Sequence, residues 1–171
     1  MLKAWGYDGA PIVLMKPTDL AAIQQLPDVG AQLLRQAGFK LDLQAMDWQT
    51  LVGRRAKKDA PDRGGWHIVM TSWQTVDVWS PIANPTMDTR GEKSGWFGWA
   101  KNDKMVGLRS DFMRATDLAV KKKLADQMHA RAFEIGTHAV LGEYDQPMAA
   151  RKNISGFFVT NGNIYWNLKK S

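Results

Sequence analysis

The stretch Gly64-Gly65-Trp66-His67-Ile68-Val69-Met70-Thr71-Ser72-Trp73 decides the fold that we expect for this sequence. Two glycines open it, apolar and β-branched residues fill it, and a tryptophan closes it before a polar segment. A short apolar run between turn signals is typical of a buried strand, most readily in a parallel sheet. We therefore predict a buried central strand over 66–72, with any ligand chemistry in the loop 73–85 that follows it.

The residues before this stretch alternate between strand and helix patterns. The first predicted element is a strand over 11–15. Helical spacing then starts at Leu20, is interrupted at Pro27, and resumes after an Asp28 cap until Gly38. A strand over 39–46 and a helix over 48–58, capped by Asp47, complete the series. A β-α-β-α-β order implies right-handed crossovers and a parallel sheet, so we expect an α/β fold.

The residues after the stretch are less regular. Segment 74–99 is rich in proline, glycine and aromatic residues. A long loop of this kind in a compact domain is usually functional or disordered, and the aromatic residues argue against disorder. Beyond it we predict a helix from a cap at 102–103 to 115 and a longer one from 116–117 to 136, with Leu118, Leu124, Met128, Ala132 and Ile135 forming its apolar stripe. Short extended pieces are predicted at 139–141, 148–151, 154–159 and 164–166.

Composition narrows the classes of function. A chain of 171 residues with 44% hydrophobic residues fits one domain, or one domain with a tail. The absence of cysteine excludes a disulfide framework and a thiolate metal site. A net charge of +6 keeps a nucleic-acid-binding module open as an alternative, but the basic residues are scattered and are not interleaved with aromatics, so we expect no nucleic-acid partner. We find no apolar run long enough for a membrane span and no signal-peptide core at the start.

Motifs for catalysis and cofactor binding do not appear. Gly64-Gly65 precedes a strand, whereas a dinucleotide-binding loop follows one. The histidines His67, His129 and His138 lack metal-ligand spacing. We therefore expect no enzyme, no catalytic residue, no metal and no cofactor. A small-substrate α/β enzyme stays open as an alternative. It would need a nucleophile–base pair or a metal, and a pocket shared by His67 and Asp77 would favour it.

Tryptophan is unusually frequent, with eight residues, and it is well suited to building a wall around a variable organic ligand. The tryptophans at 5, 48, 66 and 166 are expected to pack inside, and those near the long loop to meet ligand. Asp77 in that loop suits an ammonium group, with a solvated or capping role as its alternative, and Arg54 suits either a carboxylate or water. The predicted ligand-binding residues are Trp73, Gln74, Asp77, Trp79, Trp96, Trp99 and Arg54.

A series of short segments has a familiar order and spacing. They are Tyr7-Asp8-Gly9, Thr18-Asp19, the run 33–44, Met46-Asp47-Trp48, Arg54-Arg55, Gly64-Gly65-Trp66, Gly95-Trp96-Phe97-Gly98-Trp99, the run 150–156 and Trp166-Asn167. Together they resemble the family 5 extracellular solute-binding proteins, which are the peptide, dipeptide, oligopeptide and nickel receptors of bacterial ABC importers.

The resemblance implies a periplasmic-binding-protein type II-like lobe, with a mostly parallel sheet flanked by helices and an extended C-terminal tail. It implies a substrate-binding lobe over 1–141 and a return segment over 142–171 that would pack on a first lobe missing from this chain. We expect the unpaired tail to be disordered or exchanged in a swapped homodimer.

The implied function is transport. The intact receptor would lie in the periplasm or another extracytoplasmic location. It would hold a peptide or related small solute between two lobes and deliver it to an ABC permease in the membrane. In the family an aspartate after the central strand pairs with the peptide amino group, and Asp77 matches that position loosely. Trp73 would line the cleft.

Overall fold

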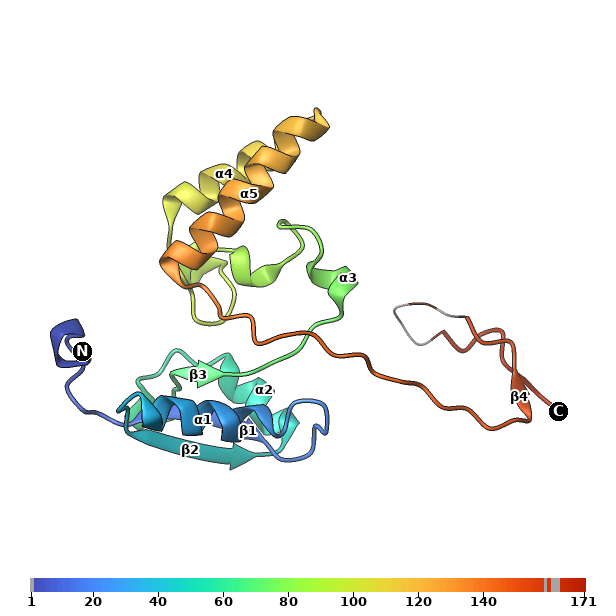
Figure 1. The fold of residues 1–171 in the computed structure, drawn as a ribbon, viewed down its shortest axis with the longest axis horizontal. Coiled ribbons are helices and arrows are strands. Elements are labelled where there is room, and N and C mark those ends of the chain that lie inside the picture. The colour runs from blue at the N-terminus through green and yellow to red at the C-terminus, as the bar shows by residue number, and fades with distance from the viewer. Residues whose placement is uncertain (1, 159, 161–163) are drawn as a thin grey trace. The chain divides into compact units, whose positions relative to one another are not determined.

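The computed structural model describes residues 2–158, 160 and 164–171. The chain divides into two compact units, Met1–Ser72 and Trp73–Ser171. Figure 1 shows the first unit as a small sheet with helices and the second as a helical hairpin with loops and a tail. The predicted boundary between 141 and 142 stays a prediction.

The first unit is an α/β unit built on a three-stranded parallel sheet in the order β2-β1-β3. Strand β1 (Ile12–Pro17) pairs with β2 (Leu41–Met46) along its whole length and with β3 (Ile68–Val69) at Leu14 and Met15. The predicted parallel α/β fold is therefore confirmed. Burial is deepest along β1, because neighbours bond to it on both sides.

The prediction of a buried central strand over 66–72 is wrong, because β1 is central and β3 is a two-residue edge strand whose side chains are half-buried. The ladder is cut short at His67, whose imidazole Nδ1 accepts a hydrogen bond from the Val13 amide at 2.9 Å. A side chain thus occupies the place that a backbone carbonyl would take in a longer strand.

Helix α1 (Leu26–Gln36) begins later than the pattern from Leu20 predicts. Pro27 lies in its first turn, where the missing amide costs nothing, so it starts the helix rather than interrupting it. Asp28 is not a cap but an ion-pair partner of Lys16, at 2.5 Å. The predicted end is confirmed: Gly38 has a φ of 96°, and the bonds of a Schellman motif close the helix.

Helix α2 (Trp48–Arg55) begins at the predicted cap, because Asp47 accepts hydrogen bonds from the amide and the hydroxyl of Thr50. These bonds also lower the pKa of Asp47. The helix ends before Lys58, where the carbonyl of Arg55 accepts a bond from the indole Nε1 of Trp66. Two 3₁₀ turns, η1 (Leu2–Trp5) and η2 (Pro61–Arg63), complete the unit.

The second unit opens with short helical turns inside the predicted irregular segment. These are α3 (Thr75–Val78), η3 (Pro85–Met87) and η4 (Gly91–Lys93). The two predicted helices follow as α4 (Asp103–Arg114), capped by Asn102, and α5 (Leu118–Ile135), capped by Asp117 and ended by Gly136. In the described part of the chain, no helix has both the length and the apolar character to cross a membrane.

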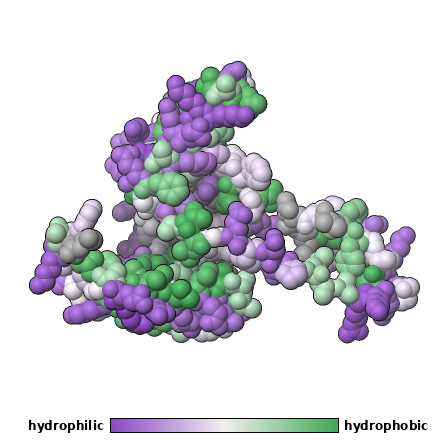
Figure 2. All heavy atoms as spheres, in the orientation of Figure 1, coloured by the Kyte–Doolittle hydropathy of each residue, from purple (hydrophilic) through white to green (hydrophobic). Residues whose placement is uncertain are grey.

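The core of the second unit is small and rich in methionine. Met87, Met105, Met128 and Ala132 are buried together, with Ile82, Leu108 and Phe112 packed against them. The predicted stripe on α5 is thus confirmed at Met128 and Ala132 but wrong at Leu118, which is 66% exposed. Figure 2 shows hydrophobic atoms among hydrophilic ones at the tip of the α4–α5 hairpin, where Met113 and Leu118 reach solvent beyond the core.

In the described residues of the tail, β4 (Ile154–Ser155) pairs antiparallel with β5 (Lys169–Lys170) of the same chain. The prediction of a strand at 139–141 is wrong, because Val140 and Leu141 are exposed and neither residue belongs to a β-sheet. The pieces predicted at 148–151 and 164–166 form no strand, whereas 154–159 is confirmed at its first two residues. Val159 lies outside the described residues, and the swapped homodimer stays a prediction.

Candidate ligand-binding site

Four aromatic rings of the second unit contact one another in a chain, which we call the aromatic cluster: Trp73, Trp96, Phe97 and Trp99. The ring centroids of Trp73 and Trp96 are 5.2 Å apart, and those of Trp96 and Phe97 are 4.7 Å apart. Phe97 meets Trp99 edge to face at 6.5 Å. Tilted and edge-to-face pairs of this kind are favourable beyond simple burial. Three of the predicted ligand residues are therefore brought together.

The backbone around the aromatic cluster is constrained. Trp99 has a φ of 47°, which is rare for a bulky residue, and Gly98 before it has a φ of 94°. Such a conformation costs on the order of 1–3 kcal/mol and tends to occur at ligand clamps and active sites. Gly95 is equally constrained, because a Cβ there would lie 2.7 Å from the carbonyl oxygen of Gly91. The Gly-Trp-Phe-Gly-Trp motif thus fixes where its rings point.

The cluster stays open to solvent, since Trp73 is 40% exposed while the other three rings are half-buried. A fully packed core would hide all four rings. An exposed aromatic surface on a fixed backbone can accept apolar parts of a ligand without demanding one side-chain shape.

Helix α3 carries the other predicted residues of this unit. Gln74 stands at its N-terminal cap position, Asp77 lies in its first turn, and Trp79 follows its last residue. Trp79 is 80% exposed and, within the described residues, is not one of the stacked rings. Within the same part of the chain, no hydrogen bond or ion pair engages the carboxylate of Asp77. It can therefore receive a cationic group, and this role stays a prediction.

Arg54 lies in the other compact unit, on α2. Its guanidinium donates to the carbonyl oxygens of Gly64 and Gly65 at 2.9 and 2.7 Å, and also to the side-chain oxygen of Gln44. These bonds hold the turn before β3 against α2, which is a structural role that the sequence did not reveal. Its predicted role toward a ligand stays a prediction.

The histidines have local explanations. The Nδ1 of His67 is engaged by Val13, so that nitrogen is not available as a base. His138 follows the end of α5, where burial and the neighbouring His129 lower its pKa. Among the described residues, no group of three or more His, Cys, Asp or Glu side chains could hold a metal ion.

Two expectations about tryptophan packing are wrong and two are supported. Trp5 and Trp166 are 85% and 86% exposed, because the terminal segments that carry them bury little. Trp48 and Trp66 are half-buried. The site prediction also missed Phe97, which links Trp96 to Trp99 and which the Gly-Trp-Phe-Gly-Trp motif could have indicated.

The chain is similar to known proteins both in sequence and in fold. No protein-family model matches the sequence. The chain is 32% identical over its 171 residues to a "probable peptide ABC transporter periplasmic-binding protein" of Sinorhizobium fredii, and it spans 32% of the length of that protein.

Two solved structures share the fold. NikA of Staphylococcus aureus, in complex with Ni(L-His)2, matches 99% of this chain with a TM-score of 0.75 at 17% identity, over 36% of its own length. A nickel ABC transporter protein of Bacillus halodurans matches 77% of this chain with a TM-score of 0.56, also at 17% identity, over 27% of its own length. The comparisons in sequence and in fold confirm the resemblance of this chain to a portion of the family 5 solute-binding proteins of ABC importers.

Proposed function

We propose that this chain is part of the substrate-binding component of a bacterial ABC importer and that the aromatic cluster contacts a peptide or a related small solute. The observation that carries the proposal is the cluster itself, which joins Trp73 and Trp96 to Trp99 through Phe97. Trp99 has a strained backbone, and Trp73 is 40% exposed. The name of the Sinorhizobium fredii relative supports peptide as the ligand class.

The chemistry of a peptide fits the residues that surround the cluster in the sequence. Aromatic rings offer apolar contact to many side chains, as a receptor of broad specificity requires. The carboxylate of Asp77 would pair with the ammonium group of the peptide, and Gln74 and Trp79 would contact the chain beside it. Arg54 would contact a carboxylate through the N–H groups that are not bonded to Gly64, Gly65 or Gln44.

The remaining parts of the proposal concern a longer receptor. That receptor would work outside the cytoplasm, where its first lobe would close over the ligand and receive the return segment 142–171. An ABC permease in the membrane would then take the solute. The chain alone should bind weakly, because it supplies part of the contacts and cannot enclose a ligand. A swapped homodimer through the tail is the arrangement that we propose for the chain by itself. We propose no catalytic step.

The test is a titration of the full chain with the tripeptide Ala-Phe-Ala, followed by tryptophan fluorescence. We expect a dissociation constant on the order of millimolar and a loss of at least about fivefold in affinity on Trp96→Ala, since aromatic anchors dominate contact energies. Trp5→Ala is the matched control, because it removes an indole that is 85% exposed in the other unit. Equal affinities of the two variants would contradict the proposal.

A second arm tests the role of Asp77. Asp77→Asn should weaken Ala-Phe-Ala but leave N-acetylated Ala-Phe-Ala unchanged, because only the free peptide carries an ammonium group. Equal weakening of both peptides would show that Asp77 does not recognise the ammonium group, and unchanged affinity for both would remove Asp77 from the site; either result leaves the aromatic cluster in place.

A further inference from the structure

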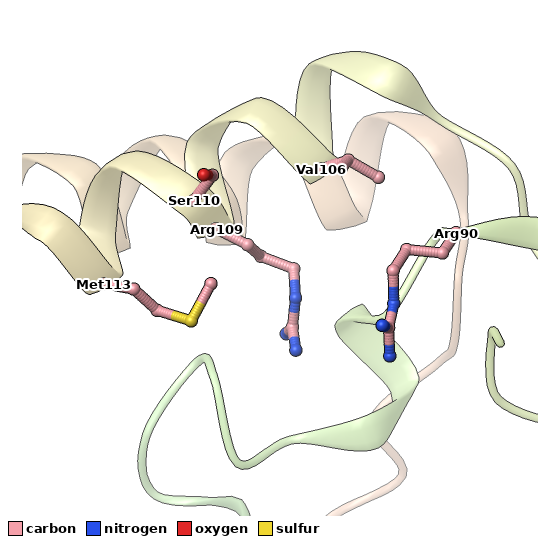
Figure 3. A pocket seen from close by; sticks show the side chains of 5 residues that line it. All are labelled: Arg90, Val106, Arg109, Ser110 and Met113. Carbon is pink, nitrogen blue, oxygen red and sulfur yellow. The ribbon is translucent and has the colours of Figure 1, made fainter.

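A hollow of about 290 Å³ opens beside α4, lined by Arg90, Val106, Arg109, Ser110 and Met113. None of these residues belongs to the aromatic cluster. Figure 3 shows the guanidinium groups of Arg90 and Arg109 extending into the same space, one from the turn before η4 and one from α4. The two cations are close enough to affect each other electrostatically.

Arg109 is held in place before any ligand arrives. Its side chain is half-buried and donates to the carbonyl oxygens of Pro81 and Ile82 at 2.6 and 3.0 Å. Burial lowers the pKa of Arg109, because a half-buried guanidinium is partly removed from water. A guanidinium has five N–H donors, so these two bonds leave donors for another acceptor.

Among the described residues, Asp88 is the carboxylate that pairs with Arg90 and also acts on Arg109. The Nε of Arg90 donates to Oδ1 of Asp88 at 2.8 Å and its Nη2 to Oδ2. Arg90, and to a smaller extent Arg109, lowers the pKa of Asp88. Two guanidinium groups facing one carboxylate leave one positive charge uncompensated in this group of three side chains.

The rest of the lining is suited to an organic anion. Val106 and the thioether of Met113 form apolar walls, and the Ser110 hydroxyl accepts a bond from Arg114, which leaves its own hydrogen to donate. The planar fork of a guanidinium matches a carboxylate. A doubly charged phosphate would exceed the uncompensated charge and would leave the apolar walls unused.

We propose that the hollow between Arg90 and Arg109 is a separate binding site for a monocarboxylate that carries a short apolar chain. The carboxylate contacts the two guanidinium groups, and the chain lies on Val106 and Met113. Such a ligand is either a small free acid or the C-terminal end of a peptide. The site is independent of the proposed transport function, since its lining includes no residue of the aromatic cluster.

The experiment follows the arginine Nε–Hε and methionine methyl NMR signals of the full chain. The probes are isocaproate, its neutral match isocaproamide, and acetyl-glycyl-leucine with a free carboxylate. We expect isocaproate to shift the Arg90, Arg109 and Met113 signals with a dissociation constant on the order of millimolar, as is usual for ligands of this size. Tighter binding of acetyl-glycyl-leucine would assign the hollow to peptide ends, and tighter binding of isocaproate to free acids; both support the site.

Variants separate this site from general attraction to a basic protein. Arg90→Gln should weaken isocaproate by about tenfold, the usual effect of losing one charged hydrogen-bonding partner. Met113→Glu should weaken it to a similar degree, since it puts a competing carboxylate at the rim. Lys122→Gln on α5 removes the same charge elsewhere and should change affinity by less than about twofold.

Three results would overturn the proposal. Equal shifts with isocaproamide would show that the charge is irrelevant, and equal shifts with sulfate would indicate an adventitious ion only. Arg90→Gln and Met113→Glu both behaving like Lys122→Gln would show that isocaproate binds elsewhere.

Discussion

The two compact units bury their cores by different means. In Met1–Ser72, strand β1 supplies three consecutive buried residues, Val13, Leu14 and Met15, between two hydrogen-bonded neighbours. In Trp73–Ser171, the core consists mainly of methionines that meet between helices and turns. Backbone ladders fix the first core, whereas flexible thioether side chains fill the second.

The two units also differ in where the candidate ligand-binding residues lie. In the first unit, the guanidinium of Arg54 is bonded to three acceptors of the same unit. The second unit holds the aromatic cluster, the strained Trp99 and the hollow at Arg109. Since methionine adapts its shape to its neighbours, the core of the second unit should tolerate rearrangement more readily than the strand core.

The strand core should respond most strongly to truncation. Leu14→Ala removes a side chain with no exposed surface and leaves a cavity beside two fixed strands. We expect a loss of about 3–5 kcal/mol in the free energy of unfolding, in the upper range for buried leucine. Urea denaturation gives the size of the loss, and hydrogen exchange shows whether β1 loses protection. A loss below about 1 kcal/mol would mean that the sheet repacks freely and would break the comparison.

The turn before β3 should be the next most sensitive point. A Cβ at Gly65 would lie 1.9 Å from the carbonyl oxygen of Asp59, which is backbone and cannot rotate away. We expect Gly65→Ala to cost about 1–3 kcal/mol. Gly53→Ala is the control, because nothing lies within 4 Å of its Cβ position.

Gly53→Ala lies in the interior of α2, where it should raise the free energy of unfolding by about 0.5–1 kcal/mol. Thermal unfolding of both variants checks the contrast. Opposite signs are expected, and a shared sign would show that helix α2 and the turn do not differ as described.

The same substitution in both cores sharpens the comparison further. Met105→Leu lies in helix α4, where leucine is favourable. Met15→Leu lies in β1, where a side chain branched at Cγ must fit against one face of a fixed sheet. Both should cost less than about 1.5 kcal/mol, with Met15→Leu the more costly. Chemical denaturation of the pair decides this, and the reverse order would argue against a more adaptable core in the second unit.

The smallest effect should come from Asp88 and Arg90. Because Arg90 lowers the pKa of Asp88 from 3.8, the pair stabilises the fold at neutral pH. This contribution is lost as pH falls through the folded pKa, since the unfolded state takes up the proton first. Asp88→Asn should cost about 0.5–1 kcal/mol at pH 7, as Arg90 is half exposed, and nothing once both states are protonated. A difference that persists unchanged in strong acid would show that charge is not the cause.

The sequence predicted the first unit well because its signals are local. Asp47, Gly38 and the apolar run at 11–15 each act through near neighbours, and each is confirmed. The central position of β1 was missed because strand order depends on long-range pairing. The replacement of a strand bond by the imidazole of His67 has no sequence signature.

The candidate site was predictable in part. The Gly-Trp-Phe-Gly-Trp motif signals crowded aromatic residues, and the structure joins them to Trp73. The hollow at Arg90 and Arg109 was invisible in the sequence, because its two cations are separated along the chain and only tertiary structure brings them together. Strand β5 was missed for a similar reason, since two lysines are a weak strand signal.

The most direct test of the central claim is a native mass spectrum of the full chain mixed with an equimolar library of di- to pentapeptides. The account predicts weak adducts with peptide masses, enriched in peptides with apolar or aromatic side chains and reduced in the Trp96→Ala variant. Adducts of equal abundance in the Trp96→Ala and Trp5→Ala variants, or bare protein at millimolar peptide, would contradict the assignment of the aromatic cluster as the ligand surface.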